Sequence, residues 1–155
     1  MKKSSLALLL LLTVSHFGFS QVRGYAEISG AISTKTEYVG SLELGIKPIN
    51  TNLYFGVMGQ AFTANQTKDQ TTHALVAPKI SYAIPVSMKF SIDPFAGGAY
   101  QYGGNENYRV SEFGPMFGSK FAFGLKNNGY FFVTPSIVLT SNRLYELGIG
   151  FGGIF

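Results

Sequence analysis

Acidic and basic side chains are few in this sequence, and eight of them fall in segments where small or polar residues alternate with large apolar ones. They are Glu27, Glu43, Lys47, Lys79, Asp93, Glu112, Lys120 and Glu146. Both signs are present, so these side chains could pair in an interior and avoid isolated buried charge. A small ion or ligand could instead use five of them along its path, Glu43, Lys79, Glu112, Lys120 and Glu146, although we favour a salt-bridge network.

Residues for catalysis or metal binding are scarce. Cysteine is absent, which excludes thiolate chemistry and cysteine-based metal sites. Histidine occurs twice, as His16 and His73, and a triad would have to use His73 with Asp69, without a serine nearby in the sequence. No cluster of histidine and carboxylate residues has ligand spacing. We therefore predict no catalytic residues, no metal and no cofactor, and interpret His73 as a solvated loop residue.

The glycine-rich stretch near the end of the sequence does not have the form of a nucleotide-binding loop. Gly148, Gly150 and Gly152 recur with a period of two, and no helical pattern follows them. Glycine at alternate positions of a strand leaves space on one face. We expect this face to line a narrow interior.

The first twenty residues have the pattern of a cleaved secretory signal peptide. Lys2 and Lys3 precede an apolar run over 6–14, and Gly18 and Ser20 are small residues before a cleavage point at Gln21. The run is too short to span a bilayer as a helix. We expect a signal peptide over 1–20 and one domain over 21–155. Ten basic and eight acidic side chains then remain, which gives no reason to expect a nucleic-acid partner.

The rest of the chain alternates with a period of two, which is typical of strands. We predict eight strands, over about 24–34, 37–47, 52–62, 74–84, 90–101, 111–125, 130–140 and 144–155. Turn-forming residues separate them, as in the segment 126–129, which reads Lys-Asn-Asn-Gly. The strands are about as long as the roughly 9–11 residues that cross a membrane.

The two faces of these strands predict which side meets water. Charged residues are 13% of the chain, against about 25% in ordinary globular domains. A soluble sandwich would then have glycine and alanine, with few charges, on its solvent face. In a membrane barrel, large apolar residues face lipid, and small and polar ones face the lumen. We predict an all-β fold, an eight-stranded antiparallel up-and-down transmembrane barrel.

Tyrosines at strand ends predict an aromatic girdle, in which hydroxyl groups lie near lipid headgroups. The girdle residues are Tyr25, Tyr38, Tyr54, Tyr82, Tyr100, Tyr102, Tyr130 and Tyr145. The last strand is amphipathic, with Tyr145, Phe151 and Phe155 on one face. A terminal phenylalanine on such a strand is similar to the signal by which outer-membrane barrels are recognised for insertion.

Taken together, the signal peptide, the girdle and the final strand resemble those of the small eight-stranded outer-membrane barrels of the OmpA/OmpX-like class. The resemblance covers the mature chain and is architectural. It implies location in the outer membrane of a Gram-negative cell envelope, with outer-membrane lipid and the barrel-insertion machinery as partners. The turns near 48–52, 85–89 and 126–129 would then be periplasmic.

Three functions stay open. The first is a structural or surface-interaction role, for which the polar segments 63–73 and 102–110 would be extracellular loops. The second is a narrow, porin-like channel or a small-ligand carrier that uses the lumen charges. The third is a secreted soluble β-barrel that binds an apolar ligand, with the two faces reversed.

Four prolines argue against the strand assignment: Pro78, Pro94, Pro115 and Pro135 lie inside predicted strands. Each removes a hydrogen-bond donor from the sheet, and proline normally occurs at edges or bulges. A closed barrel has no edge, so we expect a bulge or a shifted register at each.

Overall fold

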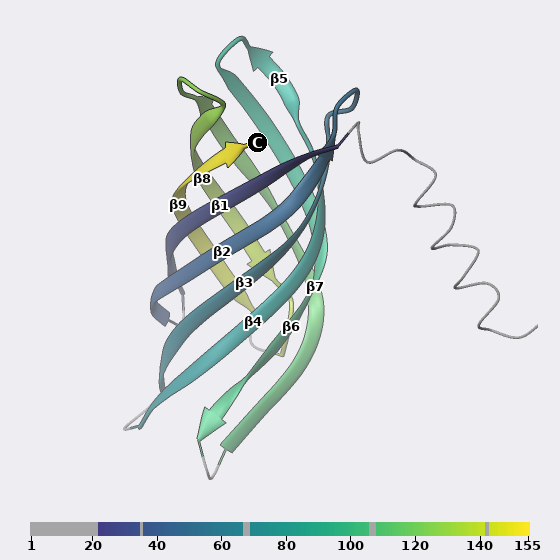
Figure 1. Cartoon of the computed structure of the whole chain (residues 1–155). Coiled ribbons are helices and arrows are strands. Elements are labelled where there is room, and N and C mark those ends of the chain that lie inside the picture. Colours follow the sequence, from purple (N-terminus) through teal and green to yellow (C-terminus); the bar gives the residue numbers. More distant parts are fainter. Residues whose placement is uncertain (1–21, 35, 67–68, 106–107, 142) are drawn as a thin grey trace, which may run out of the picture.

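Strands form almost all of the described chain (Figure 1). The computed structural model describes residues 22–34, 36–66, 69–105, 108–141 and 143–155, and the side chains of 36–38, 64–66, 69–71, 105 and 108–110 are also outside the description. The predicted signal peptide over 1–20 lies outside the described residues. Within them, no helix is long and apolar enough to cross a membrane.

Nine labelled strands follow one another along the chain. They are β1 (Val22–Ser33), β2 (Thr36–Pro48), β3 (Leu53–Gln66), β4 (Asp69–Tyr82), β5 (Ile84–Ser87), β6 (Phe90–Asn105), β7 (Tyr108–Gly124), β8 (Gly129–Val138) and β9 (Leu144–Ile154). Sequential strands pair antiparallel except across the β4–β5 step, β1 pairs with β9, and β4 pairs with β6. The sheet therefore closes on itself.

β4 and β5 act as one strand with an interruption. Ser81 pairs with Phe95 and Ile84 pairs with Ile92, so both segments keep the same register against β6. Between them, Ala83 donates its N–H to the carbonyl of Asn52 at 2.8 Å instead. The barrel thus has eight strands, as predicted from the alternation of the sequence.

The two ends of the barrel differ, and we name them the terminal end and the distal end. The terminal end holds Val22, Ile154 and the turns at 49–52, 88–89 and 125–128 (Figure 1). At 125–128 the chain turns with positive φ at Asn127 and Asn128, both 58°, the geometry that a tight hairpin requires. The distal end holds the other ends of the strands, from Ser33 and Thr36, Gln66 and Asp69, Asn105 and Tyr108, to Val138 and Leu144.

The predicted polar loops 63–73 and 102–110 are largely strand, so this expectation was wrong. β3 and β4 stay paired as far as Gln66 and Asp69. β6 and β7 stay paired as far as Asn105 and Tyr108. The polar residues of these segments stay paired in the sheet, because strand pairing satisfies the hydrogen bonds of the backbone whatever the side chain is.

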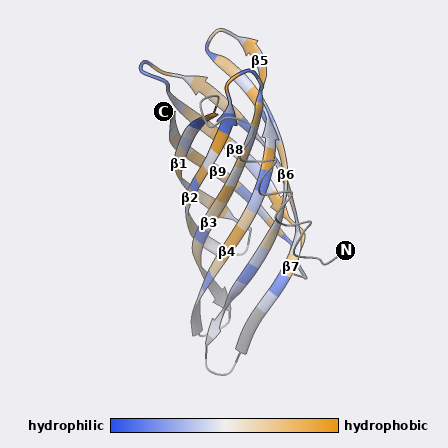
Figure 2. Ribbon diagram, turned by 45° about the vertical axis from the view of Figure 1, so that its right-hand side comes forward, coloured by the Kyte–Doolittle hydropathy of each residue, from blue (hydrophilic) through white to orange (hydrophobic). Residues whose placement is uncertain are grey.

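The outer surface is apolar. Alternation along the strands appears in Figure 2 as a succession of hydrophobic and hydrophilic segments. The exposed large side chains include Ile28, Leu42, Leu44, Phe55, Val57, Ile80, Phe113, Phe117, Leu147, Ile149 and Phe151. A soluble barrel with reversed faces would bury these residues, so the structure contradicts that face assignment.

The prolines fit the barrel without the bulges that we expected. Pro78 coincides with a gap in the β4–β6 ladder and Pro135 with a gap in the β7–β8 ladder, and the register is the same on both sides of each gap. Pro94, on β6, lies opposite the interruption between β4 and β5. Pro115 lies just past the last β7–β8 pair, where its carbonyl accepts from Leu139 at 2.9 Å. Each missing donor therefore removes a local hydrogen bond but does not shift the register of the strands.

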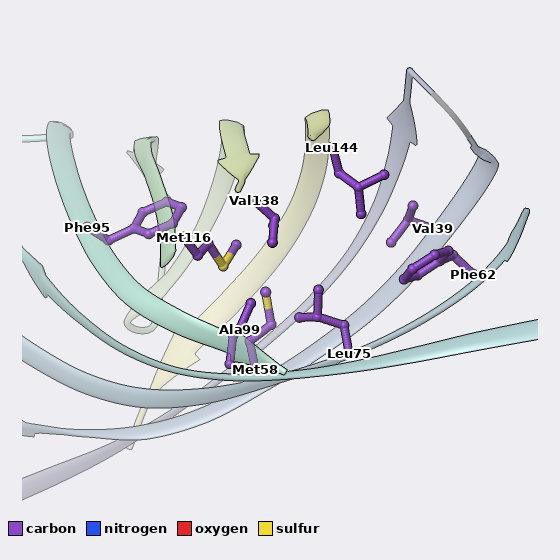
Figure 3. Close-up of a cluster of buried hydrophobic side chains, with 10 residues drawn as sticks. Val39, Met58, Phe62, Leu75, Phe95, Ala99, Met116, Val138 and Leu144 are labelled. Carbon is purple, nitrogen blue, oxygen red and sulfur yellow. The ribbon is translucent and has the colours of Figure 1, made fainter. Parts of the chain in front are cut away.

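A cluster of apolar side chains fills the middle and distal part of the lumen (Figure 3). Its residues, which we call the apolar plug, are Val39, Met58, Phe62, Leu75, Ala77, Phe95, Ala99, Met116, Val138 and Leu144. They come from all the paired strands except β1 and β5. The lumen is thus packed with side chains here, as expected for an interior of eight strands.

Candidate functional site

Buried charges occupy the terminal half of the lumen. Glu27 on β1 and Lys120 on β7 form an ion pair across the barrel. Lys79 on β4 and Glu43 on β2 form a second one, with Nζ 2.6 Å from Oε2. Asp93 on β6 lies 3.8 Å from Lys120, measured between Oδ2 and Nζ. All five side chains are more than nine-tenths buried, and we call them the charge layer.

Two tyrosines complete the charge layer by donating hydrogen bonds to its carboxylates. Tyr25 donates to Glu43 at 2.6 Å, and Tyr130 donates to Glu27 at 2.6 Å. A hydrogen bond to a charged acceptor is stronger than a neutral one, and it satisfies lone pairs that an ion pair leaves open. Each glutamate therefore has a lysine and a tyrosine as partners.

Aromatic rings surround the lysines of the charge layer. The Lys120 ammonium lies 5.3 Å from the centroid of Tyr130 and 5.6 Å from that of Tyr54. Lys79 lies 4.4 Å from the centroid of Phe95. Tyr25 and Tyr54 meet edge to face at 5.4 Å. These contacts stabilise cations that have little water around them.

Three predicted girdle residues are therefore in the wrong place. Tyr25, Tyr54 and Tyr130 are buried in the lumen and cannot meet lipid. The hydroxyl groups of Tyr25 and Tyr130 donate to buried carboxylates instead of lying at a headgroup layer. Tyr82, Tyr100, Tyr102 and Tyr145 are exposed on the outer surface, as a girdle requires, and the side chain of Tyr38 lies outside the described residues.

Phenylalanines form the aromatic row on the outside of the terminal end. Phe90, Phe123, Phe131 and Phe151 lie side by side on four successive strands, β6 to β9. Their ring centroids are 4.8, 6.2 and 5.5 Å apart in that order. The sequence placed Phe151 on the apolar face of the last strand, but it predicted an aromatic girdle of tyrosines.

The remaining predicted lumen charges lie apart from the charge layer. Glu146 is buried in the distal half, where Oε2 accepts from Gln60 at 3.1 Å and Ser136 at 3.4 Å. Lys47 is half-buried at the terminal end, 5.0 Å from the centroid of Tyr54. Glu112 is half-buried at the distal end and accepts from the Ser141 amide at 3.1 Å.

The interpretation of His73 as a solvated loop residue was wrong. It lies on β4 and is buried in the lumen. Its ring stacks on Phe62 with centroids 5.3 Å apart, and its Nδ1 lies 3.4 Å from Gln101 Nε2. In the described residues, no group of three or more histidine, aspartate or glutamate side chains could hold a metal ion.

The inner glycines of β9 make room for the rings of β8. Gly150 pairs with Phe132 and Gly152 pairs with Tyr130. A Cβ at either glycine would overlap the ring of its partner. The space that the sequence predicted is therefore used by a neighbouring strand, and it allows Tyr130 to reach Glu27.

Comparison with known proteins finds similarity in structure alone: no family model matches the sequence, and no curated protein does. The N-terminal barrel of Pseudomonas aeruginosa OprF matches with a TM-score of 0.70 and 13% identity, covering 86% of this chain and 97% of that one. A major outer membrane protein from Thermus thermophilus matches with a TM-score of 0.68 and 10% identity, covering 86% and 99%. Ail, the attachment invasion locus protein of Yersinia pestis, matches with a TM-score of 0.55 and 10% identity, covering 87% and 97%.

These similarities and the closed sheet agree on the fold. The chain is an eight-stranded antiparallel β-barrel of the architecture found in small outer-membrane proteins. At such low identity the similarity concerns the fold alone.

Proposed function

We propose that this protein is a bacterial outer-membrane β-barrel with a structural or surface-interaction role and an interior closed to diffusion. The observation that supports this proposal best is the position of its apolar side chains, which are on the outside of a closed barrel. In water such a surface would associate or aggregate, whereas in lipid it is the expected outer face. The described strands of the closed barrel are also long enough to cross a bilayer.

Aromatic side chains support the same proposal at both ends of the barrel. The phenylalanine row of β6 to β9 surrounds part of the terminal end. Exposed Tyr100, Tyr102 and Tyr145 lie toward the distal end. Aromatic residues of membrane barrels gather at the two interfaces. In this orientation the terminal end would be periplasmic and the distal end extracellular.

The distal end is where a surface partner would be contacted. β6 and β7 continue as a pair to Asn105 and Tyr108, whereas β8 already ends at Val138, opposite Met116. One side of the barrel is therefore taller than the other. Ail, which has the same fold, bears the name of an attachment invasion locus protein, and a role in surface contact for this chain is our proposal.

Fractionation with gel mobility tests the membrane proposal. The protein should appear in the outer-membrane fraction, and an unboiled sample should migrate differently from a boiled one, because a closed barrel resists SDS until it is heated. A variant with Leu147 and Ile149 both changed to Lys is the matched test of the outer face. It should lose membrane insertion, since lysine at mid-bilayer costs about 2–4 kcal/mol in a barrel. A protein recovered as soluble in the periplasm would overturn the proposal.

The surface role needs a separate measurement. Cells that express the protein would be compared with cells that express a version in which residues 65–70 are replaced by an Asn-Gly turn. Reduced adhesion to surfaces or to other cells, with an unchanged heat-dependent shift on gels, is the expected result. Equal adhesion of both strains would leave the structural role and remove the surface role at this hairpin.

A further inference from the structure

The terminal end of the lumen contains a cavity of about 260 Å³. Its deep end is formed by Asp93 and Lys120 of the charge layer, and Tyr54 and Tyr130 contribute to its walls. The hairpin of β5 and β6 forms another part of the wall. Pockets for drug-sized ligands measure roughly 300–1,000 Å³, so this cavity suits a smaller molecule.

Asp93 presents an unused acceptor to this cavity. The residue is only 3% exposed, and its Oδ1 has no hydrogen-bond partner among the described residues. Lys120 does not satisfy it, because the Lys120 ammonium is bonded to Glu27 and stays 3.8 Å from Oδ2 of Asp93. A buried carboxylate oxygen without a partner is costly, so a donor from a ligand would stabilise it.

Lys47 presents the opposite charge to the same cavity. Its ammonium lies over the Tyr54 ring, and no described carboxylate is within ion-pair distance of it. Lys47 is half-buried, which indicates a position near the mouth of the cavity, whereas Asp93 is buried deep inside it. The charge layer has three carboxylates and two lysines, so one negative charge inside is not balanced, and the cavity lining adds the positive charges of Lys47 and Lys89.

The walls between these charges combine polar residues with apolar ones. Ala83, Ala122 and Ile154 line the cavity together with the faces of Tyr54 and Tyr130. Beyond the charge layer the apolar plug fills the lumen. A ligand would therefore reach Asp93 from the terminal end, and an aliphatic group of the ligand would contact small aliphatic and aromatic side chains of the wall.

We propose that this cavity binds a small zwitterion of amino-acid size. The ligand's ammonium group donates to Oδ1 of Asp93, its carboxylate pairs with Lys47, and an aliphatic side chain packs on the apolar walls. These contacts lie inside the barrel, so they are the same whichever membrane holds the protein.

Three related probes test this proposal on the purified barrel in detergent micelles: L-leucine, L-leucinamide and N-acetyl-L-leucine. The first has both charges, the second has only the ammonium, and the third has only the carboxylate. Titration would be followed by NMR of the methyl groups of Ile154 and Met88, which line the cavity. We expect saturable shifts with L-leucine and at least about tenfold weaker binding of the other two, since each lacks one charge-assisted contact.

Single substitutions test whether Asp93 and Lys47 bind the two charged groups of the ligand. Asp93→Asn and Lys47→Met should each weaken L-leucine binding by about tenfold or more. Glu112→Gln and Lys126→Met, which change charges that do not line the cavity, should bind as the unchanged protein does. The heat-dependent gel shift verifies that each variant is folded, and Lys47→Met, near the mouth, keeps the test decisive if Asp93→Asn does not fold.

Three outcomes would overturn the proposal. They are the absence of saturable shifts with L-leucine, equal binding of all three probes, and unchanged binding by folded Lys47→Met. None of these results bears on the membrane proposal, which the fractionation measurement decides.

Discussion

The tyrosines in the lumen show how a barrel of this size holds five charged side chains away from water. Each ion pair shares its glutamate with a phenol: Tyr130 with Glu27, and Tyr25 with Glu43. Burying an ion pair has a desolvation cost that attraction alone does not always repay. The additional hydrogen bonds reduce that cost, and the ring contacts do the same for the lysines.

Replacing Glu27 tests this arrangement. Glu27→Gln would remove the closest anion of Lys120 and leave the lysine with Asp93 at 3.8 Å. Removing one partner of a buried pair typically costs about 3–5 kcal/mol, and we expect about 3 because Asp93 remains. The measurement is the free energy of unfolding by urea in lipid vesicles.

Glu146 provides the matched control. It is buried on β9, but no lysine or arginine of the described part of the chain lies within ion-pair distance, and its Oε1 has no partner there. Glu146→Gln would remove an unpaired buried charge while keeping the shape, so its unfolding free energy should rise or change by less than about 1 kcal/mol. An equal loss in both variants would contradict the distinction between paired and unpaired carboxylates.

At the scale of the strand, glycine and proline determine how neighbouring strands approach. Gly118 lies next to the ladder gap at Pro135, and a Cβ there would overlap the Pro135 carbonyl and the Phe95 ring. Gly97 has the same relation to the carbonyl of Pro78. Both gaps thus lie beside residues without side chains, which allows the two backbones to stay close where a donor is missing.

Two glycines of β9 give a measurable contrast. Both face the lumen, but a Cβ at Gly150 would overlap the Ile28 carbonyl, whereas a Cβ at Gly148 would come no closer than 3.6 Å to Ala31. Gly150→Ala should lower the free energy of unfolding by about 1–3 kcal/mol, the usual cost of overpacking. Gly148→Ala should be neutral or stabilising by about 0.5–1 kcal/mol, since glycine weakens a strand. Urea unfolding in vesicles compares them, and equal stability of the two variants would contradict this account.

Sequence alone predicted the eight strands, the outward apolar face and the tight turn at Asn127 and Asn128, because period two and turn chemistry are local signals. The prediction misplaced Tyr25 because it considered how near the residue lies to the end of its strand and did not consider which face of the strand it occupies. Tyr25 lies two residues before Glu27 and therefore on the same face, which the alternation could have revealed. The pairing partners across the lumen depend on closure of the barrel, so spacing could not predict them.

At the scale of the whole molecule, the two halves of the lumen differ. The terminal half has the charge layer and a cavity, while the middle and distal part has the apolar plug. A second small cavity, of about 30 Å³ between the charge layer and Glu146, has room for roughly one or two waters. The described residues therefore provide a charged, open chamber at one end and, beyond it, an interior in which apolar side chains are packed with a few buried polar ones such as Glu146.

Conductance measurements test closure of the lumen. In planar bilayers the unchanged protein should give no discrete current steps, because an eight-stranded lumen is filled by side chains. Met58 and Met116 are both buried in the plug, and Met58→Gly with Met116→Gly should open small steps. Met88→Gly, at a fully exposed position of the terminal turn, is the control and should stay silent. Reproducible steps in the unchanged protein would instead favour the narrow-channel hypothesis.

The apolar plug makes the lumen open at one end of the barrel and packed toward the other. A lumen that is packed beyond its charge layer is a blind chamber, with its entrance at the terminal end. Any molecule that enters must leave by the same mouth, so its occupancy equilibrates with one compartment and is independent of concentrations on the other side. Such a chamber would report on, or buffer, the solution that bathes its mouth.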